Sequence, residues 1–275
     1  MSLLVLLALI LVGLIVGFTS GLVGIGGGVL IVPFLYFFYG HSDWSGVNVP
    51  PELHTAAAHA TSLFVVVPTA LWGARSFTKA GLVIWKAALP IAAVSAVAAV
   101  LGARLALIMA PASVRTAFGV FLLVIGIQLL WRPHALSGRP LRLHPVAVIA
   151  SGLVAGLLSG LMGIGGGAIT APMLIYLIGL DLKPAAATSL AIIGLAAISG
   201  TITYAMSGLG VQGMPPGSVG YVHVLAAVPI LAGSVVSVKW GTIANQRMPE
   251  KSLKWVFAAF FTLLGLYLIW QNLPA

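Results

Sequence analysis

Apolar runs recur along this chain, and several approach or exceed the roughly 20 residues that an α-helix needs to cross a membrane. Apolar residues make up 60% of the 275 residues and charged residues only 6%, whereas soluble domains carry about 25% charged residues. No hydrophilic stretch is long enough to fold as a separate soluble domain. The sequence therefore predicts one all-α polytopic membrane protein.

Charge and residue types exclude several classes of function. The net charge is +9, but the basic residues lie mostly in short loops, where they set membrane topology rather than bind nucleic acid. The chain has no Cys, which excludes disulfides and thiolate metal sites. Its His residues are scattered without metal-ligand spacing, so we expect no metal and no cofactor. Residues 3–17 lack a preceding basic region and are predicted to be a helix rather than a signal peptide.

The chain contains two copies of one sequence pattern. The block 17–28 recurs as 156–167, 139 positions later, and the Ala-Thr-Ser-Leu block 60–63 recurs as 187–190, 127 positions later. From residue 90 onward the matches return to an offset of 139. We predict a first repeat at 1–132, a cytoplasmic linker at 133–144 and a second repeat at 145–275, which together form one transport domain.

Each repeat begins with a long apolar stretch that glycines interrupt, at 3–40 and at 145–180. Three further apolar segments follow in each repeat, at 54–73, 82–109 and 115–131 and then at 185–206, 219–243 and 253–270. The predicted fold is therefore a helical hairpin plus three transmembrane helices, twice over, with 8–10 membrane segments in all.

The basic residues predict how these segments are oriented. If each interrupted stretch turns back on itself, the loop cations fall on one side of the membrane: Arg75, Lys79, Arg132, Arg139, Arg142, Lys183, Arg247, Lys251 and Lys254. A single crossing would distribute them over both sides, against the positive-inside rule. The two repeats are then inverted relative to each other, a recurrent design of secondary transporters. We expect a multi-pass protein of the bacterial cytoplasmic membrane with both termini outside.

The glycine runs are the strongest candidates for a binding site. Gly26, Gly27 and Gly28 break the first stretch, and Gly165, Gly166 and Gly167 break the second. Such breaks expose backbone N–H groups, and a helix that starts there points its positive dipole end at the break. The alternative is close helix packing through small residues. A phosphate-binding P-loop is excluded because Val29 and Ala168 follow the runs instead of Lys.

Hydroxyl groups recur in the next helix of each repeat, as Thr61 and Ser62 and as Thr188 and Ser189. These hydroxyls could donate to an oxyanion. Alternatively, each could bond back to the preceding helical turn, as Ser and Thr do in membrane helices. The sequence leaves both roles open.

Ionisable residues are scarce within the predicted spans, and none of them is acidic. A carboxylate proton relay or an acidic cation site is therefore not expected, which favours an anionic substrate. His59 lies two residues before Thr61 and could donate to the substrate or take up a proton with it. Arg104 lies near a span end, where it either faces the permeation path or snorkels to the headgroups. Hydrogen-bonded packing is the alternative role of His59.

The two Gly-Ile-Gly-Gly-Gly runs followed by Pro33 or Pro172, together with the two Ala-Thr-Ser-Leu blocks, resemble the sulfite exporter TauE/SafE family of membrane permeases. The resemblance covers the whole chain. It implies movement of sulfite, sulfoacetate or other sulfonates, with proton coupling. It also implies that the glycine runs, the prolines and the Thr-Ser pairs form an inherited core, whereas no family motif includes His59 or Arg104.

These observations predict a secondary transporter that moves a small sulfur-containing oxyanion by alternating access. An anion channel is the first alternative. A membrane-embedded enzyme ranks after it, because the sequence contains no recognised catalytic motif. The expected partners are a small anionic solute and membrane lipid, without nucleic acid. Protons as the coupling ion and a homodimeric assembly are left open.

Overall fold

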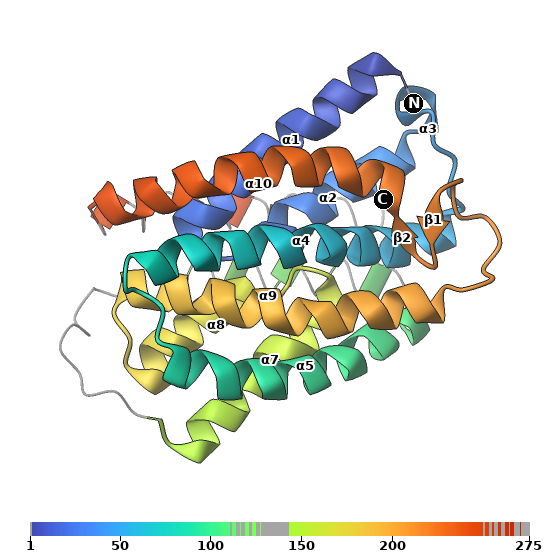
Figure 1. Ribbon diagram of the computed structural model, residues 1–275. Coiled ribbons are helices and arrows are strands. Elements are labelled where there is room, and N and C mark those ends of the chain that lie inside the picture. Colours follow the sequence, from blue (N-terminus) through green and yellow to red (C-terminus); the bar gives the residue numbers. More distant parts are fainter. Residues whose placement is uncertain are drawn as a thin grey trace.

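The computed structural model describes residues 2–110 and 143–249, with scattered residues of 112–127 and 251–270. Most of the predicted segments 115–131 and 253–270, and most of the predicted linker 133–144, lie outside the described residues. Figure 1 shows the remaining helices lying side by side along one common direction.

The first repeat is helical throughout its regular elements. Its helices are α1 (Leu3–Val23), α2 (Gly28–Gly40), the short α3 (Ser42–Ser45), the 3₁₀ turn η1 (Pro51–Leu53), α4 (His54–Lys79) and α5 (Trp85–Ile108). The first interrupted stretch is thus divided by the glycines at 24–27, and the predicted segment 54–73 extends to Lys79.

The second repeat follows the same order with local differences. It contains α7 (Pro145–Met162), α8 (Gly167–Met173), the π-helical turn η2 (Leu174–Ile178), α9 (Leu182–Ser207), β1 (Ser218–Val219), β2 (Val222–His223) and α10 (Val224–Arg247). β1 and β2 form an antiparallel pair in which Ser218 faces His223. The predicted helix 219–243 therefore begins five residues late, because the glycine-rich loop before it closes as a small hairpin.

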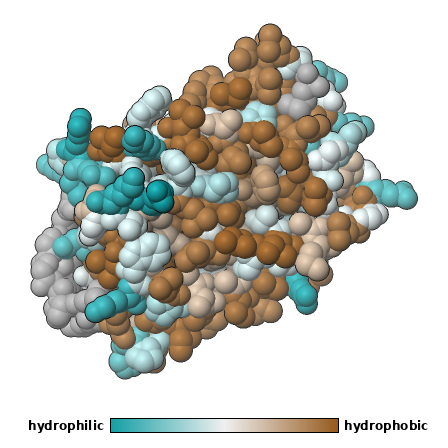
Figure 2. Space-filling view, viewed as in Figure 1, coloured by the Kyte–Doolittle hydropathy of each residue, from teal (hydrophilic) through white to brown (hydrophobic). Residues whose placement is uncertain are grey.

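Among the described residues, six helical segments are long and apolar enough to cross a membrane: α1, η1 with α4, α5, α7, α9 and α10. Two shorter apolar helices, Gly28–Gly40 and Gly167–Ile178, follow the glycine breaks. Apolar side chains cover the flank of the helices, and hydrophilic side chains gather toward the two ends, most densely at the left one (Figure 2). The prediction of an all-α polytopic membrane protein is confirmed, with the small hairpin as an addition.

Helices of different repeats pack in pairs through glycines. On α1, a Cβ added to any of three glycines would collide with the α10 backbone, in the pairs Gly13 with Ile230, Gly17 with Ser234 and Gly21 with Val238. The residue numbers rise together, so α1 and α10 are parallel. Glycines permit this close approach because they have no side chain.

The helices α7 and α5 pack in the same way. Here the glycine-bearing helix α7 comes from the second repeat and its partner α5 from the first. The α7 glycines meet the α5 backbone in the pairs Gly152 with Ile91, Gly156 with Ser95 and Gly160 with Ala99. Each of these six positions lies 139 residues from its counterpart in the α1–α10 pair. Such reciprocity is the property of a two-fold axis, in which the same surfaces meet twice.

The central helices α4 and α9 run in opposite directions. An added Cβ on Gly73 of α4 would meet Leu190 near the start of α9, and one on Gly200 near the end of α9 would meet Leu63. By contrast, α4 runs parallel to α10, because Thr69 pairs with Ser234 at 2.7 Å and Ser76 with Thr242 at 2.9 Å. Since α1 is also parallel to α10, α2 must return the chain to the end where α1 began.

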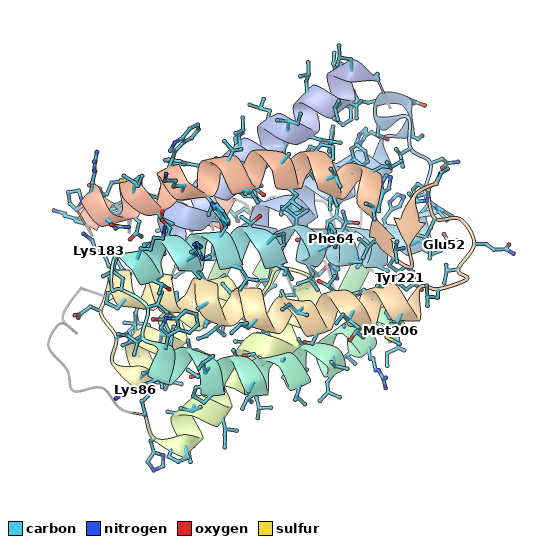
Figure 3. The ribbon with its side chains drawn as sticks, in the orientation of Figure 1. Glu52, Phe64, Lys86, Lys183, Met206 and Tyr221 are labelled. Carbon is cyan, nitrogen blue, oxygen red and sulfur yellow. The ribbon has the colours of Figure 1, made fainter. Side chains whose placement is uncertain are left out.

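The two ends of the molecule differ in charge. Lys86 and Lys183 lie at one end, here called the basic end, whereas Glu52, Met206 and Tyr221 lie at the opposite end (Figure 3). No Asp, Glu, Lys or Arg is buried among the residues that the structure describes. The interior therefore carries no fixed charge there, as hydrocarbon requires.

Candidate functional site

The two glycine breaks have nearly the same local structure. Gly24 caps the end of α1, where its N–H donates to Ser20 O at 2.8 Å, and Gly163 caps the end of α7, where its N–H donates to Ser159 O at 2.9 Å. Gly26 and Gly165 both have φ of 78°, a left-handed conformation that other residues rarely adopt. The first N–H groups of the next helix have no carbonyl partner within that helix.

The two breaks touch each other. A Cβ added to Gly28 would lie 2.6 Å from the Ile164 Cα, and one added to Gly167 would collide with the backbone of Ile25. These contacts are again reciprocal. The first residue of α2 packs against the second break, and the first residue of α8 packs against the first break. The structure thus brings the two predicted glycine runs together.

The two breaks lie between the central helices α4 and α9, and each begins against the central helix of the opposite repeat. The first break places Gly24 against Ala186 and Gly26 against Ile193, both on α9. The second places Gly163 against His59 of α4, while Gly165 lies nearest to Ile193 of α9 and next to Val66 of α4. Since Val66 and Ile193 are close to the middle of their helices, the breaks meet at about half the depth of the molecule.

Two buried serine hydroxyls face these breaks without a partner. Ser62 lies between His59 and Val66 on one face of α4, and Ser189 occupies the same place on α9. Both side chains are 0% exposed, and neither hydroxyl has a hydrogen-bond partner. An unpaired buried hydroxyl costs about 1–3 kcal/mol, so both groups are available to a polar ligand.

Ser20 and Ser159 form a second pair that the sequence analysis did not select. Each is at most 1% exposed and each hydroxyl lacks a partner. Their Cβ atoms lie 3.5 Å and 3.2 Å from where a Cβ on Gly27 and Gly166 would be. The duplicated Ser-Gly dipeptide inside the repeated block was the signal that could have identified them.

Thr61 and Thr188 have partners of a different kind. The Thr61 hydroxyl accepts from the backbone N–H of His223 at 3.0 Å, and the Thr188 hydroxyl accepts from that of Ile84 at 3.0 Å. His223 and Ile84 are the residues just before α10 and α5. Each Thr therefore holds the first turn of a helix, in the same way in both repeats. Their predicted contact with substrate remains a prediction.

His59 is enclosed between two tyrosines. Its Nε2 lies 2.6 Å from the Tyr36 hydroxyl of α2, and its Nδ1 lies 3.3 Å from the Tyr204 hydroxyl of α9. The Tyr204 hydroxyl also donates to Gly160 O at 2.9 Å. A neighbouring set joins Tyr39 to Thr61 and to His223, each at 3.4 Å.

His223 is buried, although its place near a helix start predicts an interfacial side chain. It is 1% exposed, and this burial lowers the pKa of its imidazole to about 4. The imidazole is therefore neutral at physiological pH and serves as a hydrogen-bonding partner of Tyr39.

Arg104 is not brought to the glycine breaks. Its side chain is exposed on α5, so the structure offers no contact between it and the buried hydroxyls. Other cations gather at the basic end, where a cavity of about 140 Å³ is lined by Trp72, Arg75, Ser76, Lys79 and Lys239. Cations of this kind fit the headgroup region of a membrane.

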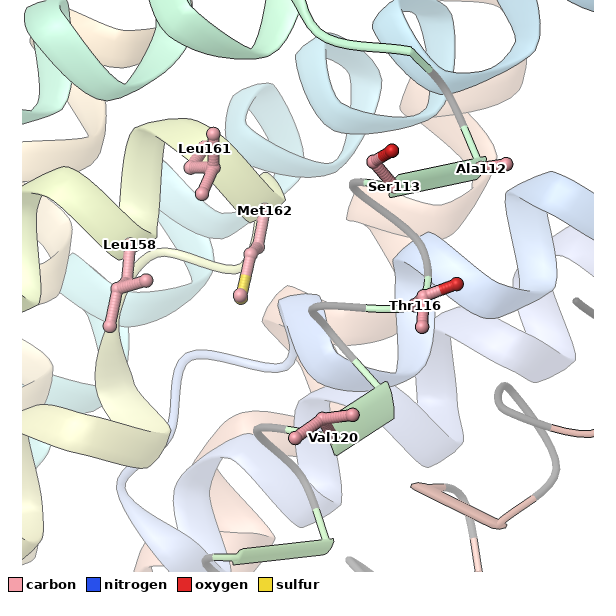
Figure 4. A pocket seen from close by; sticks show the side chains of 7 residues that line it. All are labelled: Ala112, Ser113, Thr116, Val120, Leu158, Leu161 and Met162. Carbon is pink, nitrogen blue, oxygen red and sulfur yellow. The ribbon is translucent and has the colours of Figure 1, made fainter.

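A larger cavity of about 720 Å³ opens beside the second break (Figure 4). Its lining is mostly apolar and comprises Ala112, Ser113, Thr116, Val120, Leu158, Leu161 and Met162. Met162 is the last residue of α7 before the break. An apolar lining suits an acyl chain better than an oxyanion, so this cavity is distinct from the hydroxyl-lined breaks.

Comparisons with known proteins agree with the architecture. A family model described as sulfite exporter TauE/SafE matches residues 9–268. A probable membrane transporter protein of Methanocaldococcus jannaschii is 32% identical over 97% of this chain and 96% of its own length. One of Haemophilus influenzae is 30% identical over 94% and 95%, and YunE of Bacillus subtilis is 29% identical over 96% and 97%. No solved structure matches the chain significantly.

Proposed function

The chain belongs to the sulfite exporter TauE/SafE family of membrane transporters, and on that premise we propose that it moves a small sulfur-containing oxyanion, such as sulfite, sulfoacetate or another sulfonate. Transport proceeds by alternating access, with the substrate held where the two glycine breaks meet. The observation that carries this proposal is the reciprocal contact of the breaks beside partnerless, buried serine hydroxyls.

The chemistry of this region suits an anion. Hydroxyl and amide hydrogens are donors, and the start of α2 directs its dipole toward the break. No buried carboxylate is present among the described residues to bind a cation instead. Four serine hydroxyls from α1, α4, α7 and α9 would then surround an oxyanion, which has several acceptor oxygens, without introducing a permanent charge into the membrane.

The inverted arrangement of the repeats, 1–132 and 145–275, is part of the proposal. It is supported by the opposite directions of the counterpart helices α4 and α9. Alternating access follows from such symmetry, because exchanging the conformations of the two repeats moves the opening from one side to the other. The basic end is assigned to the cytoplasm by the positive-inside rule, with the linker on that side and both termini outside.

This orientation can be tested with single cysteines, because the chain has none of its own. A membrane-impermeant maleimide added to intact cells should label Ser2→Cys and Leu209→Cys. It should label Lys79→Cys only after the membrane is permeabilised. Leu209 is 66% exposed, so access at that position is not limited by burial. Labelling of Lys79→Cys in intact cells would contradict the assigned orientation.

The transport activity is tested by flux into proteoliposomes. Sulfite, sulfoacetate, taurine and thiosulfate should be compared, and at least one should show uptake that saturates and supports counterflow. Saturation with counterflow distinguishes a carrier from an anion channel. Absence of flux for every anion, from protein shown to be folded by size-exclusion chromatography, would contradict the proposal.

A further inference from the structure

The polar group around His59 has no equivalent in the other repeat. Tyr36, His59 and Tyr204 correspond to Ile175, Ala186 and Phe77, at the offsets of 139 and 127 that relate the repeats. The backbone around them is nevertheless equivalent, since Gly163 packs against His59 as Gly24 packs against Ala186. One side of the proposed binding region is therefore closed by hydrogen bonds, and its symmetric counterpart by apolar side chains.

The hydrogen bonds of Tyr204 indicate which nitrogen of His59 carries hydrogen. The single hydroxyl hydrogen of Tyr204 is donated to Gly160 O, so its oxygen can only accept from His59 Nδ1. In the neutral imidazole Nε2 then has no hydrogen and accepts from the Tyr36 hydroxyl at 2.6 Å. A proton added at Nε2 reverses that bond: Nε2–H donates to the Tyr36 oxygen, and the Tyr36 hydroxyl hydrogen has to turn away from His59.

His59 is also directly connected to the second break. A Cβ on Gly163 would lie 2.6 Å from the His59 Cβ and 2.8 Å from its Cγ. Tyr204 extends the connection to Gly160 in the last turn of α7. A change in the hydrogen bonds of His59 therefore acts on the backbone that leads into the break, one helical turn from Ser62.

The titratable side chains that hydrogen-bond to His59 within the described part of the chain include Tyr36 from α2 and Tyr204 from α9. The break at Gly163, which also packs against His59, is backbone. His54, five residues earlier on α4, contacts Val49 O instead at 2.8 Å. The charged residues that the structure describes all lie outside the buried interior.

We propose that His59 is the proton-binding site of the transport cycle, where one proton enters together with the oxyanion. This inference rests on the proposed function. The bound anion and the imidazolium attract each other strongly because the interior has a low dielectric constant. Each therefore favours binding of the other, by the same factor. Protonation also rearranges the Tyr36 contact, and so links proton uptake to opening of that side only.

The test compares anion binding and flux across pH in reconstituted protein. Sulfoacetate is a suitable probe because both of its acid groups stay ionised between about pH 5.5 and about pH 8, where His titrates. The apparent affinity of the wild type should increase toward low pH, approaching tenfold per pH unit for one linked proton. In His59→Ala, which restores the residue of the other repeat, and in His59→Gln, it should change less than about twofold over the range.

His54→Gln serves as the matched control, because it removes another α4 imidazole that hydrogen-bonds outside this group. Its pH profile should follow the wild type. A pH profile of folded His59→Gln that coincides with that of the wild type would overturn the proposal. Uptake of one proton per anion, measured with a pH dye inside the vesicles, should be lost in both His59 variants.

A second readout separates this proposal from the proposed function. Nitrogen NMR of imidazole-labelled protein, recorded without any anion, should show His59 with hydrogen on Nδ1 at high pH and a second hydrogen at low pH. The His59 signal should shift in Tyr36→Phe but not in His54→Gln. If no oxyanion is transported, the proposed function fails, but this titration still shows whether His59 takes up a proton. A His59 that takes up no proton down to about pH 5 would overturn the inference.

Discussion

Replacing Gly167 with alanine is expected to reduce transport by more than about tenfold and to destabilise the fold by roughly 1–3 kcal/mol, the usual cost of overpacking. The added methyl group would collide with the backbone of Ile25 and would lie 2.5 Å from the Ile193 Cδ1. Gly28→Ala should have the same effect, because its Cβ would lie 2.6 Å from the Ile164 Cα. Backbone cannot rotate away as a flexible side chain can, so the two breaks must separate.

Gly40→Ala is the matched control for Gly28→Ala, since Gly40 closes the same helix α2 and has no atom within 4 Å of an added Cβ. Flux and thermal unfolding of that variant should match the wild type. The measurements are initial rates in proteoliposomes and unfolding temperature in detergent. Wild-type flux in Gly167→Ala would show that the contact between the breaks is not needed for transport.

The double variant Ser62→Ala with Ser189→Ala is expected to bind the oxyanion more weakly without losing stability. Both hydroxyls are buried without partners, so their removal should leave the free energy of unfolding unchanged or raise it, by up to about 1 kcal/mol at each position. Affinity for the oxyanion should fall by about tenfold for each hydroxyl, the equivalent of roughly 1.4 kcal/mol. Thermal unfolding without substrate and the concentration dependence of flux measure the two effects.

Thr61→Val provides the contrast, because it removes the acceptor of the His223 N–H. A buried N–H without an acceptor should destabilise the protein by about 1–3 kcal/mol. Removal of the Thr61 hydroxyl is thus expected to lower the free energy of unfolding, whereas removal of the neighbouring Ser62 hydroxyl leaves it unchanged or raises it. A double serine variant that unfolds earlier than the wild type, with unchanged affinity, would assign those hydroxyls to packing.

The sequence indicated several features that later observations bear out. The membrane class follows from the length of the apolar runs, and the family from the doubled glycine block. The glycine breaks divide both interrupted stretches where the runs occur. These are local properties, because helix length, hydropathy and left-handed glycine conformations depend on residues close together in the chain.

The contents of the candidate site were decided by tertiary packing. Thr61 and Ser62 are adjacent, yet one holds the start of α10 and the other faces the second break unpaired. His59 acquires its partners from α2 and α9, and Arg104 remains on the surface.

By itself the sequence determined that two glycine-broken copies would lie in a membrane, and left open which surface each copy would cover. Only the tertiary structure decided that the two breaks meet each other, and that Gly24 packs against α9 and Gly163 against α4 of the other repeat. The physical reason is that the breaks meet each other and the two central helices through residues about 100 or more positions apart in the chain. Such close approaches depend on the shapes of whole helices, which no local periodicity encodes.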